Sequence, residues 1–323
     1  MSKYNDYIYD TIASASPRIA EILCNEMDRQ EENCELIASE NFVSDAVLAA
    51  VGSCFTNKYA EGYPISRHSG REGRYYGGTQ NVDELEEYCC NKWREVFNTD
   101  YHVNVQPHSG SQANFAAYMS VLNPGDTILS MSLENGAHLT HGSSVNFSGK
   151  LFNMVFYDVD KNGFIDYFDL AQKIAIYNPK LVLAGASAYP RIIDFKRIKE
   201  LIDGVSDKYG RTSPYFMVDM SHIAGLVAAG YHPSPFELAD IITTTTHKTL
   251  RGPRGGLIFC KPELAKKVDG AVFPGSQGGP LEHVIAGKAI AAEEACTPEY
   301  KEYIHQVVRN CKAMCNKFIE LGY

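Results

Sequence analysis

The 323-residue sequence lacks the marks of membrane, secreted and nucleic-acid-binding proteins. It has no run of about 18 apolar residues, which argues against a transmembrane helix. Residues 1–18 contain Asp6 and Asp10 and no basic stretch followed by an apolar block, so we predict no signal peptide. Acidic residues outnumber basic ones by 39 to 30, and the net charge of −9 disfavours binding to nucleic-acid phosphates. We therefore expect a cytoplasmic protein that binds neither membranes nor nucleic acids.

The cysteines also lack a recognisable spacing. There are nine, an odd number, and Cys89 and Cys90 are adjacent. Cys311 and Cys315 lie one helical turn apart, but no second pair or histidine cluster completes a zinc site. We predict reduced, mostly buried cysteines and no metal.

What the sequence contains is an alternation of short apolar runs and amphipathic stretches. A polar, helical arm is predicted over 1–35, and a helical period returns from 298 until Gly322 caps it. The predicted helices between them are 83–97, 112–122 and 194–206. The predicted strands are 126–131, 181–185, 215–219, 240–244 and 256–260. Continuous apolar strands that alternate with helices indicate an α/β domain with a mostly parallel sheet.

Polar residues stand where several of these strands end, which is where open α/β sheets bind ligands. Asp219 ends one strand and is followed by His222, whereas His247 and Lys248 follow another. Ser187 lies beyond the strand 181–185. The turn Ser109, Gly110 and Ser111 opens the helix 112–122.

Each of these features has two interpretations. The Ser-Gly-Ser turn suits a phosphate, but it also suits an ordinary N-cap. Lys248 suits a Schiff base, which needs a desolvated amine, but a lone lysine is more often a surface residue. Asp219 could be the carboxylate partner of a pyridine nitrogen, or the N-cap of the next helix. Its spacing to His222 would also allow a metal site, but no third ligand accompanies them. Taken together, a lysine, a carboxylate and a phosphate cup favour pyridoxal 5'-phosphate.

The sequence resembles serine hydroxymethyltransferase, also called glycine hydroxymethyltransferase, along essentially the whole chain. The resemblance is carried in order by 35–42 (ELIASENF), 59–64 (YAEGYP), 74–78 (RYYGG), 106–114 (QPHSGSQAN), 138–142 (HLTHG), 218–225 (VDMSHIAG), 243–256 (TTTTHKTLRGPRGG) and 273–280 (FPGSQGGP). It implies a fold-type I pyridoxal-phosphate enzyme, similar to aspartate aminotransferase. The implied division is an arm over 1–35, a cofactor-binding large domain over 36–290, and the first helix of a small C-terminal domain over 291–323.

The resemblance also implies a role for each matching residue. Lys248 would hold the cofactor covalently, Asp219 would keep its ring nitrogen protonated, and His138 would stack on the ring. Ser187 and His222 would lie near the phenolic oxygen. The phosphate would be held by Ser109, Gly110, Ser111 and His247, with Gly279 and Tyr59 acting across a dimer interface. Ser39 would touch the amino-acid substrate, and Glu61 would be the acid–base carboxylate. The folate-facing residues would be Tyr75, Tyr76, Leu133, Ala137, His138 and Leu139, with Tyr59 and Glu61 beside them.

The implied reaction belongs to one-carbon metabolism. Serine and tetrahydrofolate give glycine and 5,10-methylenetetrahydrofolate by cleavage of the serine Cα–Cβ bond, with pyridoxal phosphate as cofactor. The implied assembly is a homodimer, with dimer and tetramer both open. Two other functions remain open as well: a folate-independent aldolase for threonine-like β-hydroxy amino acids, and an inactive fragment that only binds the cofactor.

The sequence departs from the family at three places. The link 65–73 is longer than usual, which leaves the placement of Tyr75 and Tyr76 open. Ala137 and Ser276 stand where the family commonly has glycine. The arginine that grips the substrate carboxylate in the family has no match up to Tyr323, so we expect a chain of this length to bind the cofactor but to turn over serine poorly.

Overall fold

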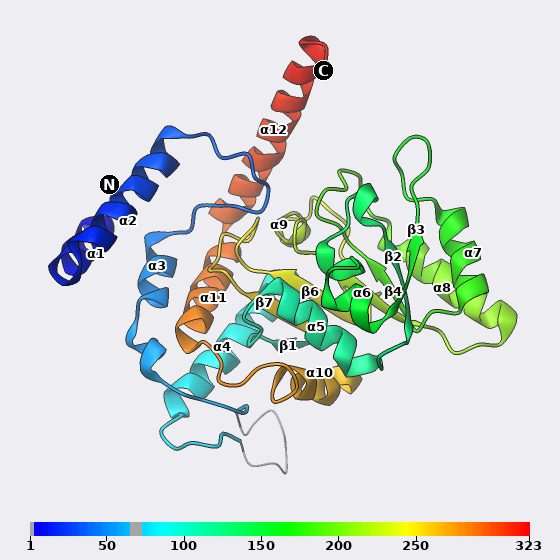
Figure 1. The fold of residues 1–323 in the computed structure, drawn as a ribbon, viewed down its shortest axis with the longest axis horizontal. Coiled ribbons are helices and arrows are strands. Elements are labelled where there is room, and N and C mark those ends of the chain that lie inside the picture. Colours follow the sequence, from blue (N-terminus) through cyan, green and yellow to red (C-terminus); the bar gives the residue numbers. More distant parts are fainter. Residues whose placement is uncertain (1–2, 65–72) are drawn as a thin grey trace.

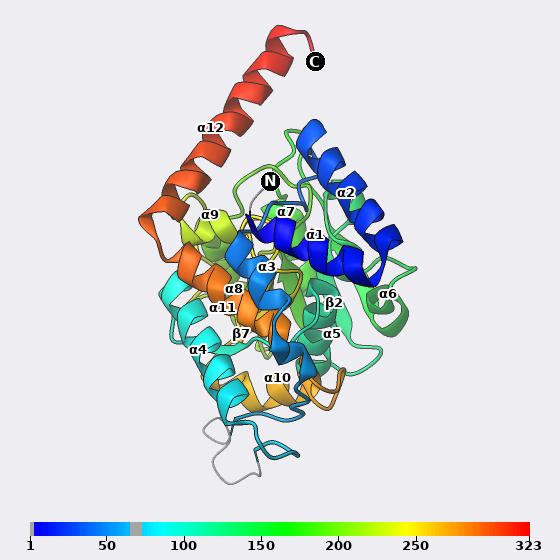
Figure 2. The same ribbon diagram turned by 90° about the vertical axis from the view of Figure 1, so that its left-hand side faces the viewer.

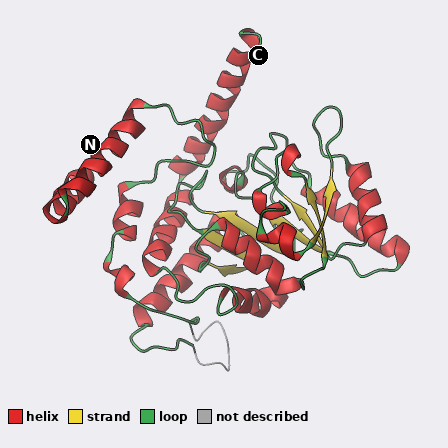
Figure 3. Cartoon of the chain, in the orientation of Figure 1, coloured by secondary structure: helices red, strands yellow, loops and turns green. Residues whose placement is uncertain are grey.

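The computed structural model describes residues 3–64 and 73–323, with side chains from Tyr7 onward. The predicted long link therefore lies outside the described residues, except for Gly73. The described chain forms a sheet with helices on both faces and two helical extensions (Figures 1 and 3).

The sheet has seven strands in the order β1-β7-β6-β5-β4-β2-β3. The strands are β1 (His102–Asn104), β2 (Thr127–Met131), β3 (Asn153–Tyr157), β4 (Leu181–Ala184), β5 (Tyr215–Asp219), β6 (Ile241–Thr245) and β7 (Gly256–Cys260). Strands β3, β2, β4, β5 and β6 are parallel, whereas β7 and β1 run antiparallel to their neighbours. The direction of winding reverses at β2, so the carboxyl ends of β2, β4, β5 and β6 open onto one crevice.

Successive residues of the strands point to opposite faces, and each face packs against its own helices. In β5, Phe216 and Val218 belong to one core cluster and Met217 to the other. The first cluster is covered by α4 (Gln80–Phe97), α7 (Tyr167–Tyr177), α8 (Phe195–Tyr209) and α11 (Glu282–Ala295). The second is covered by α5 (Gly110–Val121) and α10 (Ala265–Val272). The strands are therefore buried on both faces, as their continuous apolar sequences predict.

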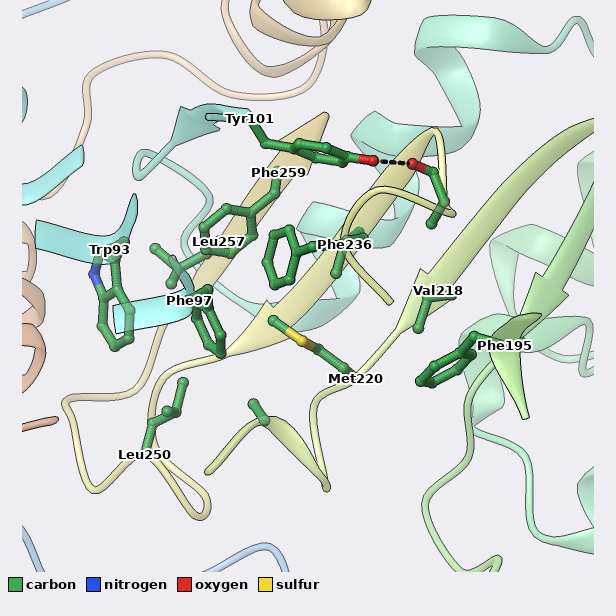
Figure 4. Packing of buried hydrophobic residues seen from close by; sticks show 14 of the residues in the cluster. Trp93, Phe97, Tyr101, Phe195, Val218, Met220, Phe236, Leu250, Leu257 and Phe259 are labelled. Carbon is green, nitrogen blue, oxygen red and sulfur yellow. Dashed lines mark hydrogen bonds between the residues drawn. The ribbon is translucent and has the colours of Figure 1, made fainter. Parts of the chain in front are cut away.

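Aromatic rings fill the first cluster where α4 meets β7 (Figure 4). The Phe97 ring centroid lies 5.2 Å from that of Phe236 and 5.4 Å from that of Phe259. The Tyr101 hydroxyl donates a 2.6 Å hydrogen bond to the carbonyl of Ala239, so its polar tip is satisfied inside this core. These contacts fix α4 against the antiparallel edge of the sheet.

The two ends of the described chain project from this body (Figures 1 and 2). The N-terminal arm is a hairpin of α1 (Lys3–Ala15) and α2 (Pro17–Glu32), in which Ser16 caps α2. At the other end, α12 (Pro298–Glu320) extends outward after α11, and Gly322 follows it with φ +87°. The remaining short helices are α3 (Asp45–Val51), α6 (Phe147–Leu151) and α9 (Ala224–Ala228), with 3₁₀ turns at Cys54–Asn57 and Pro262–Leu264.

Every predicted strand and helix is present, with ends that either agree with the prediction or shift by up to three residues. Strands β1 and β3 were not predicted. The expectation of mostly buried cysteines is wrong: Cys89, Cys90 and Cys260 are buried, but Cys34, Cys54, Cys311 and Cys315 are exposed. No disulfide links the cysteines of the described residues. Across 3–64 and 73–323, none of the helices is long and apolar enough to cross a membrane.

Candidate active site

Three adjacent parallel strands deliver polar residues to the crevice. Asp219 is the last residue of β5, Ser187 follows β4, and Lys248 follows β6. The ends of β4 and β5 approach so closely at Gly185 that a Cβ there would lie 2.0 Å from the carbonyl oxygen of Asp219. Gly185 also has φ +122°, so only glycine fits this junction without strain.

Asp219 is buried and accepts four hydrogen bonds. Its Oδ2 accepts from Asn114 Nδ2 at 2.9 Å and from His141 Nε2 at 3.0 Å. Its Oδ1 accepts from the backbone N–H and the hydroxyl of Ser221, at 3.0 and 2.6 Å. Burial alone would raise the pKa of Asp219, but His141, Asn114 and Ser221 outweigh it and hold that pKa well below its usual range. The carboxylate is thus ionised and fixed in orientation.

A second chain of hydrogen bonds fixes His138. Asn114 Nδ2 donates to Thr140 Oγ1 at 2.8 Å, which leaves the Thr140 hydroxyl to donate to His138 Nδ1 at 2.7 Å. Burial lowers the pKa of His138, so its ring is neutral with Nδ1 as an acceptor. Thr140 belongs to the 3₁₀ turn η4 (Leu139–His141), which His138 caps, whereas Asn114 reaches it from α5.

Lys248 lies in a tight loop between β6 and β7. Thr246 N–H donates to Gly255 O at 3.1 Å and Gly252 N–H to Thr246 O at 2.7 Å, so the loop closes on itself. Asn41 Nδ2 holds the backbone carbonyl of Lys248 at 2.9 Å. Burial lowers the pKa of the Lys248 amine, against the opposing effect of Asp219. A lysine of this kind is more easily deprotonated, and hence more nucleophilic, than one in solvent.

The two neighbouring histidines are also neutral at physiological pH. Burial, with the charge of Lys248, lowers the pKa of His222 to about 4. Burial, with the charge of Arg254, lowers the pKa of His247 to about 4. Neither ring therefore places a further positive charge beside the Lys248 amine.

The N-terminus of α5 faces the same space. Ser109 Oγ accepts from Gln112 N–H at 3.3 Å, so Ser109 is the N-cap. A Cβ at Gly110 would lie 2.6 Å from Thr245 Cγ2, so glycine lets the helix start pack directly on β6. Among the described residues, Thr245 Oγ1 and His247 Nδ1 are buried without a hydrogen-bond partner. Free N–H groups, hydroxyls and unpaired polar atoms thus converge at the positive end of the α5 dipole.

These residues enclose a cavity of about 200 Å³. The structure brings together in its lining ten of the residues predicted from the sequence: Ser39, Ser109, Gly110, Ser111, His138, Ser187, Asp219, His222, His247 and Lys248. A larger hollow of about 590 Å³ adjoins it and shares Ser39, His247 and Arg254 with it. The hollow is walled by α2, α3 and the 35–43 segment, so it opens the Lys248 cavity toward the N-terminal arm.

Other predicted residues gather in a second place, which we call the tyrosine cluster: Tyr59, Glu61, Tyr76 and Gly279. Tyr76 donates from its hydroxyl to Glu61 Oε2 at 3.3 Å, and the rings of Tyr59 and Tyr76 are 5.7 Å apart. A Cβ at Gly279 would lie 3.1 Å from Tyr59 Cζ. Tyr75 instead packs on Phe273, with ring centroids 5.7 Å apart. None of these five residues lines the Lys248 cavity of the same chain.

The remaining predicted folate contacts also lie outside the cavity lining. Leu133 is in the 3₁₀ turn η3 (Leu133–Asn135), and it is exposed, as is Leu139. Ala137 is buried in the core. Ala137 and Leu139 are the chain neighbours of His138, and Leu133 lies five residues before it.

The comparison with known families agrees with this geometry. The family model described as serine hydroxymethyltransferase matches residues 12–323. This chain belongs to the serine hydroxymethyltransferase family. It therefore has the fold-type I architecture, and its activity is that of the family: the reversible conversion of serine and tetrahydrofolate to glycine and 5,10-methylenetetrahydrofolate. Serine hydroxymethyltransferases are transferases that use pyridoxal phosphate as cofactor and tetrahydrofolate as co-substrate.

The cavity fits the cofactor of serine hydroxymethyltransferases. It holds a buried amine with a lowered pKa, an ionised carboxylate, and a helix N-terminus beside unpaired buried polar atoms. These are the groups that an aldehyde, a pyridine nitrogen and a phosphate require.

Sequence reasoning missed the residues that support the site. Asn114 ends the stretch 106–114 and His141 lies within 138–142, but neither was predicted as a site residue. Ser221 and Thr140 were missed as well. The sequence gives little sign that these side chains bind Asp219. Asp219 lies 105 positions from Asn114 and 78 positions from His141, so no local pattern links them.

Proposed function

We propose that the Lys248 cavity is the cofactor site of this chain, and that the tyrosine cluster completes the substrate site of a second copy. The observation that carries the first part is the convergence of Lys248, ionised Asp219 and the α5 N-terminus in one small cavity. When bound, pyridoxal phosphate supplies an electrophilic aldehyde carbon and a protonated ring that accepts the electron pair left at the substrate Cα.

Asp219 would hold the proton on the ring nitrogen. Its pKa is well below the usual range, so it stays charged when a cation approaches. Four hydrogen bonds from fixed donors keep it aimed, so it needs no reorganisation during the reaction.

Lys248 would hold the aldehyde carbon through Nζ and release it to the substrate amine. His138 would lie against the ring, held by Thr140, while Ser187 and His222 would face the phenolic oxygen. Ser109, Gly110, Ser111 and His247 would bind the phosphate at the α5 N-terminus.

The substrate side of the site would come from two chains. Ser39 lines the cavity of its own chain and would contact the amino acid. Glu61 would move a proton between the serine hydroxymethyl group and the folate, with Tyr59, Tyr75, Tyr76 and Gly279 beside it. Leu133, Ala137 and Leu139 would meet the folate at the rim next to His138.

A homodimer would join these two halves. Tyr59 and Tyr76 are 58% and 48% exposed, unusual for aromatic residues that bind a ligand, and a partner would cover them. Near Ser39, the apolar side chains of Leu36, Ile37 and Phe42 are also exposed, and a partner chain would cover them as well. We place the protein in the cytoplasm, where exposed thiols such as Cys34 and Cys311 stay reduced.

The assignment of Glu61 is tested by separating folate-dependent from folate-independent cleavage. The Glu61→Gln variant should lose about a hundredfold or more of its serine cleavage with tetrahydrofolate, because an amide cannot transfer the proton. Folate-independent cleavage of a threonine-like substrate, measured on the same preparations, should change much less. Equal losses in both reactions would show that Glu61 has no folate-specific role and would refute its assignment.

A further inference from the structure

Lys288 is a lysine in the core that the reaction does not use. It lies on α11, is 1% exposed, and donates all three of its N–H groups to backbone carbonyls. The acceptors are Val105 at 2.7 Å, Pro107 at 3.0 Å and Gly256 at 2.9 Å. Burial lowers its pKa to about 8, so at pH 7 it is mainly protonated and keeps three donors. An ammonium whose three N–H groups are all hydrogen-bonded holds the backbone in place and does not act as a nucleophile.

The segment that Lys288 holds is gripped from its other side by Gln277. Gln277 Nε2 donates to the carbonyl of Gln106 at 2.7 Å, and its Oε1 accepts from His108 N–H at 3.3 Å. In an extended chain, successive carbonyls point to opposite sides. Lys288 therefore takes the carbonyls of residues 105 and 107, and Gln277 takes the groups of 106 and 108 that point the other way.

The backbone packs closely around the two side chains Lys288 and Gln277, which we call the clamp. A Cβ at Gly255 would lie 2.4 Å from Lys288 Cε, and a Cβ at Gly256 would lie 2.5 Å from the carbonyl oxygen of Ser109. Gly256 N–H also donates to Pro107 O at 3.1 Å. The two glycines after Arg254 thus make room for Lys288 and for the chain that enters α5.

We infer that Lys288 and Gln277 are positioning residues that clamp the 105–108 segment and so set the Ser109-Gly110-Ser111 turn in place to receive the cofactor phosphate. The inference rests on the proposed assignment of that turn to the phosphate. Neither Lys288 nor Gln277 lines the Lys248 cavity, so the clamp would act on the cofactor only through the Ser109-Gly110-Ser111 turn.

The test compares pyridoxal phosphate with pyridoxal, which lacks the phosphate. Apoprotein from the wild type and from Lys288→Met is titrated with each compound, and both dissociation constants are measured. Methionine keeps the length of the side chain but removes all three donors. Lys288→Met should weaken pyridoxal phosphate about tenfold to a hundredfold and pyridoxal less than about threefold, because unpaired carbonyls let the turn move. Lys312→Met, an exposed lysine on α12, is the matched control and should change neither constant.

A second variant keeps the test decisive if Lys288→Met does not fold. Gln277→Leu removes the other side of the clamp and should show the same selective loss. Unchanged affinity for pyridoxal phosphate in both variants, or equal losses for both compounds, would overturn the clamp. Ser111→Ala separates the two claims: if it lowers the preference for the phosphorylated compound and the clamp variants do not, only the clamp fails. If Ser111→Ala and the clamp variants all leave that preference intact, the phosphate assignment fails and takes the clamp with it.

Discussion

At the scale of single residues, this site depends on buried charges whose partners are also fixed. Asp219 has four donors, and the Arg74 guanidinium, 2% exposed, pairs with Glu86 at 2.8 Å and Asp83 at 2.8 Å. A buried charge costs several kcal/mol unless such partners compensate it, so removal of either partner should have large and specific effects.

Asp219→Asn should retain some cofactor but lose nearly all chemistry at the substrate α-carbon. An amide keeps the shape but carries no charge to stabilise a protonated ring nitrogen, and a lost charged partner in a dry site is worth several kcal/mol. The exchange of the glycine α-proton with solvent deuterium, followed by NMR, measures this directly. Near-normal exchange in the variant would refute the role given to Asp219.

Glu282 provides a pH-dependent prediction. It is 1% exposed, its oxygens find no donor among the described residues, and Arg74 approaches only to 4.0 Å. Burial, with the negative charge of nearby Glu86, raises the pKa of Glu282 to about 10. The folded state therefore keeps a proton at pH 7 that the unfolded state, with a pKa near its ordinary value, has released.

The contribution of Glu282 to the free energy of unfolding should therefore fall as pH rises from 5 to 9, because at this residue the folded state keeps a proton that the unfolded state has released. Glu282→Gln removes the titration and keeps the size and shape of the side chain. As pH rises from 5 to 9, the free energy of unfolding of the variant minus that of the wild type should increase by about 1 kcal/mol per pH unit. Urea denaturation of both proteins at several pH values measures this difference. Parallel pH curves for the two proteins would show that Glu282 is not held neutral.

At the scale of elements, the site depends on close approaches between chain segments. The carbonyls on either side of Glu61, those of Ala60 and Gly62, both accept from Arg74 Nη1, at 2.7 and 2.9 Å. Gln106 Nε2 adds a 3.0 Å bond to Gly62 O. The segment that carries Glu61 is thus tied to the same 105–108 segment that leads into α5.

Gly185→Ala should disrupt the junction of β4 and β5. Its φ of +122° and the 2.0 Å approach to Asp219 O predict a loss of about 3 kcal/mol or more in stability, with weaker cofactor binding. Gly204→Ala is the matched control, because Gly204 lies inside α8 with nothing within 4 Å of a Cβ. That change should stabilise the protein by about 0.5–1 kcal/mol. Thermal unfolding of both variants measures the contrast, and similar shifts would contradict the proposed crowding.

The elements that sequence predicted well are those with a local signal. Strand β5 has a continuous apolar sequence, and its predicted ends agree with the structure. Strand β1 is three residues long and two of them are polar, so nothing local distinguishes it from a loop. Strand β3, Asn153–Tyr157, does contain a short apolar run, Met154 to Tyr157, so a local signal for it was present and was missed. It pairs with β2 alone at the outer edge of the sheet, and its residues are mostly half-buried.

The site divides in the same way. Lys248, Asp219 and the Ser-Gly-Ser turn stand at strand and helix ends, where a general rule finds them. Lys288 stands in an alanine-rich helix, and a lysine there is ordinarily exposed. Its burial follows from three carbonyls contributed by residues more than 30 positions away, which no local pattern reveals.

At the scale of the whole molecule, the predicted site residues fall into two groups that one chain does not join. Lys248 and its neighbours line a cavity, whereas Tyr59, Glu61, Tyr76 and Gly279 cluster outside its lining. A two-fold dimer can bring the cluster of each chain to the cavity of the other. The division into an arm over 1–35, a large domain over 36–290 and a further segment over 291–323 stays a prediction.

Complementation tests this arrangement. Lys248→Ala and Glu61→Gln chains should each be nearly inactive as homodimers. When equal amounts are unfolded together and refolded, half of the dimers are hybrids, and each hybrid has one intact site. Activity per chain should therefore return to about a quarter of the wild-type value. Failure to recover any activity, although mass spectrometry shows that hybrids form, would mean that each site is built from one chain.

The central claim, that Lys248 is the residue that holds the cofactor, can be tested by one labelling measurement. Of the described lysines, Lys248 and Lys288 are the buried ones, and burial lowers the pKa of both. Lys288 has no N–H to spare, whereas Lys248 lines the cavity. Borohydride reduction of the holoprotein, followed by digestion and mass spectrometry, should place the cofactor mass on the peptide that contains Lys248. Cofactor on Lys288 or on any other lysine, with Lys248 unmodified, would contradict the account.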